Sequence, residues 1–188
     1  MARGLNRESV VTARLGVVDD PIPGHGRFTG MLAIPFLDRD GKPLQLRFRC
    51  LEQHEHRDFH HGKYNSMAGD PVRMFNVGAL HRAADEIHVT EGELDALVLN
   101  QLGLPAVAIP GALLYRNHHR RMLAGFSTVW SWGDPDDAGA ELNQKIIRSL
   151  RQAKAVSLRD GDVTDTFLKG GQSAIFALIG KEEPPPWE

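Results

Sequence analysis

Residues 86–111 read EIHVTEGELDALVLNQLGLPAVAIPG and predict a strand, a helix and a second strand in immediate succession. EIHVT is a short apolar run of strand length. The segment ELDALVLNQLG places Leu94, Leu97 and Leu102 on one helical face. Gly103 is typical of the residue that ends such a helix, and LPAVAIPG is again short and apolar. Two strands joined by a helix form the unit of a parallel sheet.

The alternation of strands and helices continues to residue 171. Residues 127–133 (STVWSWG) and 153–160 (AKAVSLRD) predict two further strands. Helices are expected at 117–126, 138–153 and 165–171, the second of them long and amphipathic. The sequence therefore predicts an α/β fold with a Rossmann-like parallel sheet flanked by helices on both faces.

The first part of the chain predicts a smaller, β-rich structure. MLAIPFLD and PLQLRFRCLE flank RDGK, and Asp-Gly between two strand-like runs indicates a β-hairpin. The prolines of KEEPPPWE, at the other end, predict a tail without regular structure. We therefore expect a β-rich (α+β) subdomain at 1–83, the parallel-sheet domain at 84–172, and a C-terminal helix with a proline-rich tail at 173–188.

Acidic residues follow three of the predicted parallel strands. Glu91 follows the first strand, Asp134 and Asp136 the third, and Asp162 and Asp165 the fourth. Ligands of such sheets bind at the carboxyl ends of the strands, so these carboxylates are expected to converge on one edge. The cluster would repel itself unless a cation neutralised it, and oxygen ligands favour Mg²⁺ or Mn²⁺.

A plainer interpretation is that acids in loops cap the helices that follow them. Capping accounts for one acid in each loop, and Asp137 before AGAEL is a candidate cap. It does not account for an acid at three strand ends. The pattern therefore favours a metal site.

Several motifs in this order resemble a known family. VTEGELDAL, followed about forty residues later by GDPDDAG, resembles the two signature motifs of the TOPRIM domain. The continuation DGDVTDTFLKGG resembles a further acidic motif of DnaG-type DNA primases. GRFTGMLAIPFLDRDGKPLQLRFR, KYNS and MFNVGALHRA resemble segments of the primase polymerase core. The resemblance extends over residues 3–172, and compact primases of this kind are familiar from bacteriophages.

The resemblance implies a DNA primase catalytic core, which joins ribonucleotides into short RNA primers on single-stranded DNA for replication. It implies two or more Mg²⁺ or Mn²⁺ ions, with Asp134, Asp136, Asp162 and Asp165 as ligands. Glu91 is by similarity either a further ligand or the base that takes the proton of the 3′-hydroxyl. Pro135 departs from the pattern, because the family usually has glycine between the two aspartates.

The resemblance also indicates nucleotide-binding residues and partners. Arg49, Lys63, Tyr64 and Asn65 match primase segments that meet the nucleotide or the template. The alternative for Arg49 and Lys63 is solvated surface charge, which we expect for Arg47. Beyond the template and ribonucleoside triphosphates, the expected partners are a replicative helicase and a separate zinc-ribbon module that recognises the template.

Two other classes of protein share the TOPRIM acids. A TOPRIM-type nuclease would use them to cut phosphodiesters, and a recombination-mediator module would bind nucleic acid without catalysis. KYNS and its hairpin argue against the nuclease. The complete acidic set argues against the non-catalytic module.

Histidine and cysteine usage bears on a second metal. Cys50 is the single cysteine, so a zinc ribbon cannot form and we expect no zinc site in this chain. The segment EQHEHRDFHHGK holds His54, His56, His60 and His61 at spacings that can bind a transition metal. Because we expect no cysteine near these histidines, we interpret this segment as a polar loop.

Composition is that of a globular protein of 188 residues with 41% hydrophobic content. A net charge of −2 argues against a general electrostatic attraction to nucleic acid, although a local groove can still be basic. No apolar run is long enough to span a membrane, and the N-terminal sequence has no apolar signal segment. We therefore expect a cytoplasmic protein, in the host cytoplasm if it comes from a bacteriophage.

Overall fold

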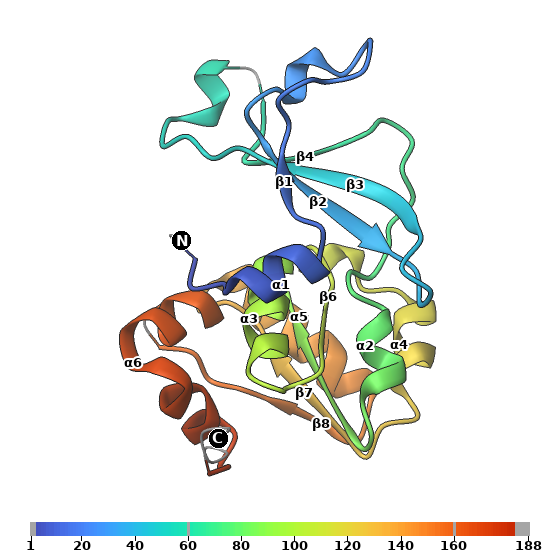
Figure 1. The fold of residues 1–188 in the computed structure, drawn as a ribbon. Helices are drawn as coiled ribbons and strands as arrows, with labels where there is room; N and C mark the ends of the chain where they lie inside the picture. Colours follow the sequence, from blue (N-terminus) through green and yellow to red (C-terminus); the bar gives the residue numbers. More distant parts are fainter. Residues whose placement is uncertain (1–2, 60, 160, 183–188) are drawn as a thin grey trace.

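The computed structural model describes residues 3–59, 61–159 and 161–182, and these form two four-stranded sheets (Figure 1). The antiparallel sheet has the order β1-β2-β3-β4, with strands Gly16–Val17, Leu32–Leu37, Pro43–Arg49 and Tyr64–Ser66. The parallel sheet has the order β6-β5-β7-β8, with β5 at Glu86–Thr90, β6 at Ala106–Ala108, β7 at Thr128–Trp132 and β8 at Ala153–Ala155. The predicted α/β fold with a preceding β-rich part is confirmed.

The hairpin of β2 and β3 forms where Asp-Gly predicts it. Phe36 pairs with Gln45, and the carboxylate of Asp38 accepts hydrogen bonds from the N–H groups of Asp40 and Lys42, at 2.9 and 2.8 Å. Gly41 has φ +79°, a conformation that glycine adopts without strain. The turn therefore fixes the register of β3, the strand that carries Arg47 and Arg49.

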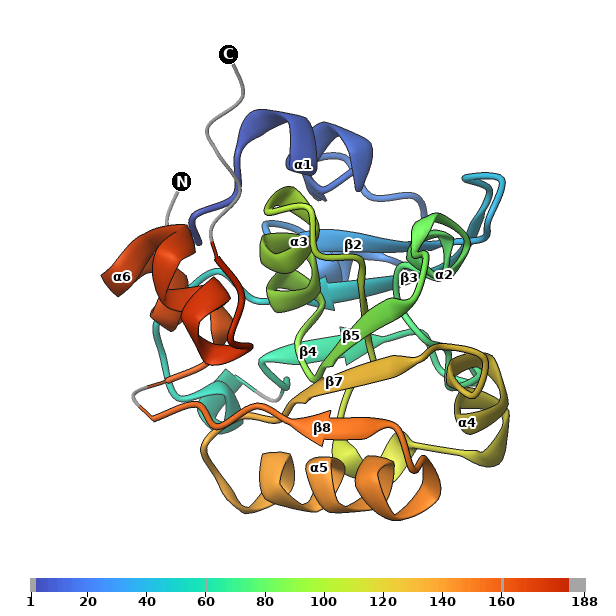
Figure 2. The same ribbon diagram turned by 90° about the horizontal axis from the view of Figure 1, so that it is seen from below.

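Helices cover both faces of the parallel sheet (Figure 2). Ile87, Val89 and Val129 face α5 (Asp137–Ser149), with whose Leu142 and Ile146 they form one buried cluster. Successive residues of a strand point to opposite faces. Trp132 accordingly belongs to a second cluster, with α3 (Glu93–Gln101) and α6 (Val163–Leu178).

The two sheets share that second cluster. Ile34 and Phe36 of β2 are buried together with Leu97 of α3 and Ile175 of α6. The N-terminal segment joins them: α1 (Arg7–Thr12) lies beside α3, and the Gln101 side chain donates to the carbonyl of Gly4 at 2.9 Å. The remaining helices are α2 (Gly78–Arg82) and α4 (Asn117–Leu123), with short 3₁₀ turns at Gly26–Phe28, His56–Phe59 and Ala112–Leu114.

The C-terminal part differs from the predicted pattern in two places. β8 ends at Ala155, short of the strand predicted to residue 160, where its pairing with Ser131 of β7 ends. The helix predicted at 165–171 extends through α6 to Leu178, with a break in helical geometry at Gly171 (φ 67°, ψ −165°). The predicted tail falls largely on residues 183–188, outside the described residues.

Within the described part of the chain, no helix is both long and apolar enough to cross a membrane.

Candidate active site

The ends of three neighbouring segments bring acidic residues together. Glu91 directly follows β5, Asp134 follows β7 by two residues, and Asp162 follows β8 as the N-cap of α6. Because β5, β7 and β8 are consecutive parallel strands of the sheet, their carboxyl ends meet at one edge. The backbone N–H of Asp134 donates to the Glu91 carboxylate at 3.3 Å.

Two glycines allow the loop after β7 to pack against the first turn of α5. The Asp136 carboxylate accepts the N–H of Gly139 at 2.8 Å and so caps this helix. A Cβ atom on Gly139 would overlap the backbone of Asp134, and one on Gly133 would overlap the carbonyl of Gly139. The spacing Asp-x-Asp-x-x-Gly therefore has a steric reason.

We expect Gly139→Ala to lower the free energy of unfolding by about 1–3 kcal/mol, because backbone atoms of Asp134 must move to admit the methyl group. Gly125→Ala is the matched control, since nothing lies within 4 Å of the position of its Cβ. Urea unfolding of both variants measures the difference. Equal stability of the two variants would contradict this steric account.

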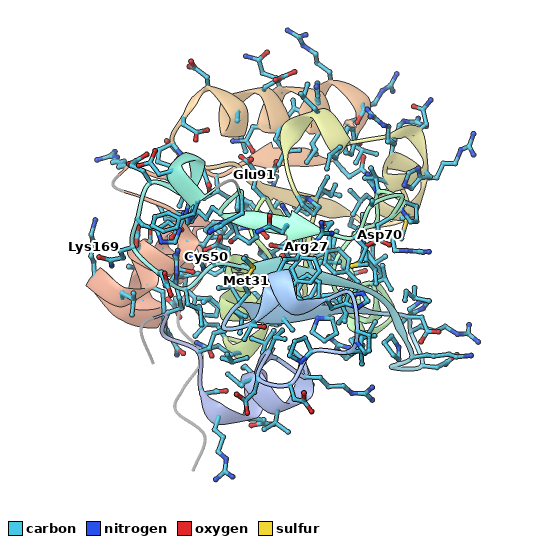
Figure 3. The ribbon with its side chains drawn as sticks, turned by 90° about the horizontal axis from the view of Figure 1, so that it is seen from above. Arg27, Met31, Cys50, Asp70, Glu91 and Lys169 are labelled. Carbon is cyan, nitrogen blue, oxygen red and sulfur yellow. The ribbon has the colours of Figure 1, made fainter. Side chains whose placement is uncertain are left out.

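A cavity of about 250 Å³ opens between the two sheets at this edge. Its lining includes the acids Glu91, Asp134 and Asp162 on one side. On the other side it includes Arg49 and Tyr64 of the antiparallel sheet and Lys63, which directly precedes β4. Figure 3 labels Glu91, which lies in the central part of that view, whereas Lys169 of α6 lies at its edge. Six predicted site residues, from segments far apart in sequence, therefore share one cavity.

The cationic wall of the cavity is held in place by Tyr64. The guanidinium carbons of Arg47 and Arg49 lie 4.6 and 5.5 Å from the centre of its ring. Arg49 is only 9% exposed, and its Nε is buried without a hydrogen-bond partner among the described residues. A buried donor of this kind is a candidate to bind an anionic ligand.

Arg47 is not the surface residue that the sequence suggests. It lines the cavity and forms an ion pair with Glu93, whose side chain is 1% exposed. Glu93 and Asp95 also line the cavity and were not among the predicted site residues. The signal was present, because both are acids inside the apolar helix sequence ELDALVL.

Asp95 connects α3 to α6. Its Oδ1 accepts hydrogen bonds from the N–H and the hydroxyl of Thr164, at 2.9 and 2.6 Å. Arg3 lines the cavity as well and forms an ion pair with Asp162 at 3.2 Å. These contacts position the Asp162 loop against the carboxyl end of β5.

Burial and mutual repulsion raise the pKa values of the clustered acids. Burial, followed by the charges of Asp95, Glu91, Asp162 and Asp136, raises the pKa of Asp134 to about 7. Burial and Asp162 raise the pKa of Asp95 to about 6. Burial also raises the pKa of Glu91, although the hydrogen bond from Asp134 opposes this. The raised pKa values show that the charged carboxylates are disfavoured in the absence of a cation. Such a cluster fits a divalent cation, which binds oxygen ligands.

These shifts predict how stability depends on pH. The folded metal-free protein holds a proton on Asp134 more strongly than the unfolded chain does. The stability that this proton contributes is complete below pH 3.8, the ordinary pKa of aspartate, and is lost as pH rises through about 7. We expect Mg²⁺ to raise the melting temperature by a few degrees at about pH 8 and hardly at all at about pH 5. Calorimetry at the two pH values checks this, and an equal effect at both would contradict it.

Three predicted residues do not line the cavity. Asp136 lies beside it as the cap of α5, and its charge acts on Asp134 and Glu91. Asp165 lies in the first turn of α6, where its N–H donates to Asp162. The Asn65 amide donates to the carbonyl of Gly62 at 2.7 Å and stabilises the turn before β4.

The loop between β3 and β4 corrects another expectation. Cys50 Sγ lies 3.8 Å from His54 Nε2, so the assumption that no cysteine is near the histidines was wrong. His60 lies outside the described residues.

A larger cavity of about 530 Å³, lined in part by Asn6, Arg39 and Asn76, is remote from the acids of the parallel sheet.

Similarity to known proteins agrees with this geometry. A family described as Toprim-like matches residues 88–166. The gene 57 protein of Mycobacterium phage D29 is 30% identical over 157 residues, which cover 81% of this chain and 99% of that protein.

The chain belongs to the family of this phage protein. A DNA primase of Pseudomonas putida is 25% identical over 178 residues, covering 86% of the chain but 26% of that primase. The chain therefore spans about a quarter of this bacterial relative. The primase fragment of the bacteriophage T7 primase-helicase superposes with a TM-score of 0.73 at 20% identity, covering 95% of the chain and 72% of the fragment. This TOPRIM protein thus has the fold of a primase catalytic core.

Proposed function

We propose that the chain is the catalytic core of a DNA primase, which joins ribonucleotides into short RNA primers on single-stranded DNA. One observation carries the proposal: the carboxylates of Glu91, Asp134 and Asp162 face Arg49 and Lys63 across one cavity. Nucleotidyl transfer requires both sides of this arrangement. Acids hold the metal ions, and cations neutralise the phosphate oxygens.

The acidic side fits Mg²⁺ or Mn²⁺. We assign Asp134, Asp162 and Glu91 to hold two or more ions, with Asp136 and Asp165 contributing charge at the same edge or direct ligands once substrate binds. When bound, such ions lower the charge on the triphosphate and favour ionisation of the attacking hydroxyl. The raised pKa of Asp134 agrees with this role, because an unneutralised carboxylate is disfavoured there.

The chain's own side chains orient the substrates. Arg49 presents its buried guanidinium to the cavity and would bind phosphate oxygens, and Lys63 would do so as a point charge. Tyr64 holds Arg49 in place and offers a ring against which a base or a sugar can pack. Glu91 would take the proton of the 3′-hydroxyl or hold an ion.

Two alternatives use parts of the same site. A nuclease would need the acids, yet it has less use for Lys63 and for a buried Arg49, whose Nε lacks a hydrogen-bond partner among the described residues. A non-catalytic module would need the cations but gains nothing from acids whose pKa values are raised by burial and by mutual repulsion. The presence of both walls in one cavity favours the primase.

The decisive assay incubates the protein with single-stranded DNA, labelled ribonucleoside triphosphates and Mg²⁺ or Mn²⁺. Oligoribonucleotides that require all three components would support the proposal. Cut DNA without RNA would support the nuclease, and DNA binding with neither product would support the non-catalytic module. The last two results would overturn the proposal.

Partners follow from the same proposal. The template is single-stranded DNA, and ribonucleoside triphosphates are the substrates. We further propose a replicative helicase and a separate zinc-ribbon module as partners that deliver and recognise the template. The T7 relative supports the first of these, since its structure is a fragment of a primase-helicase.

A further inference from the structure

Four potential metal ligands gather in the loop that joins β3 to β4. Cys50 follows β3, His54 and His56 lie within the loop, and His61 precedes β4. One ligand atom from each of the four residues lies within 4.8 Å of the others. They use soft or borderline donors, nitrogen and sulfur, unlike the carboxylate oxygens of the active site.

A hydrogen bond orients His61, and a contact with a carboxylate orients His54, toward the centre of this group. His54 Nδ1 lies 3.3 Å from the carboxylate of Glu52, and His61 Nδ1 lies 3.0 Å from the carbonyl of Gly62. The carbonyl of Gly62 requires a proton on Nδ1 of His61, and the carboxylate of Glu52 favours one on Nδ1 of His54. In a neutral ring with this proton, Nε2 carries a lone pair. Such orienting partners are typical of histidines that bind metal.

The two lone pairs face each other. His54 Nε2 and His61 Nε2 are 3.2 Å apart, with neither nitrogen available to donate to the other in these tautomers. His56 Nδ1 is also buried and has no hydrogen-bond partner among the described residues. Close, unpaired acceptors are unfavourable unless a cation lies between them.

Two of the distances between ligand atoms are close to those of a tetrahedral zinc centre. Zinc bonds of about 2.0–2.1 Å to nitrogen and about 2.3 Å to sulfur give N···N edges of about 3.3 Å and N···S edges of about 3.6 Å. The observed edges are 3.2 Å between His54 and His61, and 3.8 Å between Cys50 and His54. We propose that Cys50, His54, His56 and His61 bind one zinc ion.

Four protein ligands leave no open position, so the zinc is structural. The small core of this half consists of Phe28, Met31 and Phe48 and includes no residue of the loop. Phe59 in the loop is 60% exposed. With so little apolar burial, the metal bonds would hold the loop in its folded shape.

The position of this zinc site links it to the cavity wall. Arg49 immediately precedes Cys50, and Lys63 and Tyr64 follow His61 closely. The N–H of Cys50 donates to the carbonyl of Lys63 at 2.9 Å. This hydrogen bond joins the two ends of the loop next to Arg49 and Tyr64. The expectation of no zinc site rested on the absence of paired cysteines. A site made of one cysteine and three histidines does not need such a pair.

The first test measures zinc in the full chain, purified with a tag that contains no histidine and passed over a chelating resin. Elemental analysis should give about one zinc per chain, falling below about a tenth in Cys50→Ser and His61→Gln. His81→Gln is the matched control, because His81 is exposed on α2, and it should retain the metal. A wild-type chain without zinc, or variants that keep it, would overturn the proposal.

The second test does not depend on the folding of any variant. The chain is stripped of metal and titrated with Co²⁺, which gives strong visible absorption in a tetrahedral site and a thiolate-to-metal charge-transfer band when cysteine binds it. Both bands should saturate at about one equivalent and disappear when Zn²⁺ is added. Weak octahedral absorption without the thiolate band would overturn the proposal. Neither readout involves primer synthesis, so the outcome is independent of the proposed function.

Discussion

Asp134→Asn is expected to lower the rate of primer synthesis at least about a thousandfold while raising the melting temperature of the metal-free protein. Asp134 lines the cavity, and burial, together with the charges of Asp95 and Glu91, raises its pKa to about 7. Asparagine keeps the size but removes the charge. Repulsion therefore falls, and so does the ability to hold a metal ion.

The substitution is thus expected to lower the rate of synthesis but to raise the melting temperature. Rate assays measure the first effect, and thermal unfolding without metal measures the second. Asp137→Asn is the matched control, because Asp137 is exposed at the start of α5, three residues from Asp134, and does not line the cavity. Near-normal synthesis by Asp134→Asn, or an equal loss in the control, would contradict the assignment.

Glu91→Gln is expected to reduce synthesis by about 10²- to 10⁴-fold and to leave binding of single-stranded DNA unchanged within about twofold. The Glu91 carboxylate accepts the N–H of Asp134, and the amide oxygen of glutamine can accept the same bond. The loop should therefore keep its shape. What is lost is a group that can take a proton or hold a cation.

Rate and DNA affinity are measured on the same preparation, by single-turnover synthesis and by fluorescence anisotropy. Glu86→Gln is a suitable control, since Glu86 lies at the other end of β5 and contacts Lys181 and Trp130 rather than the cavity. If Glu91→Gln lost synthesis, DNA binding and folding together, Glu91 would be a structural residue instead.

The sequence predicts those parts of the fold that depend on local patterns. The strand at Glu86–Thr90 and the helix at Glu93–Gln101 lie where apolar spacing and Gly103 indicate them. The Asp-Gly turn sets the hairpin through the side chain of Asp38. The meeting of Glu91, Asp134 and Asp162 was predictable too, because parallel strands align their carboxyl ends.

Pairings between distant segments were not predictable in this way. Arg47 was expected at the surface. Its burial depends on an ion pair with Glu93, 46 positions away in sequence, and no local pattern indicates that pair. Thr164 and Asp95 are 69 positions apart, and no local pattern marks their hydrogen bonds. The histidines of the cysteine–histidine group were recognised as possible metal ligands, but the fold of the loop, which brings Cys50 within 3.8 Å of His54, was not predicted.

The most direct test of the central claim asks whether the template chooses the nucleotide. Homopolymeric single-stranded DNAs of each base are offered in turn, with all four ribonucleoside triphosphates, one of them labelled, and Mg²⁺ or Mn²⁺. If the chain is a primase core, the incorporated ribonucleotide changes with the template and always complements it, and Asp134→Asn incorporates none. Incorporation that ignores the template, or a template that is cut while no RNA forms, would contradict the account.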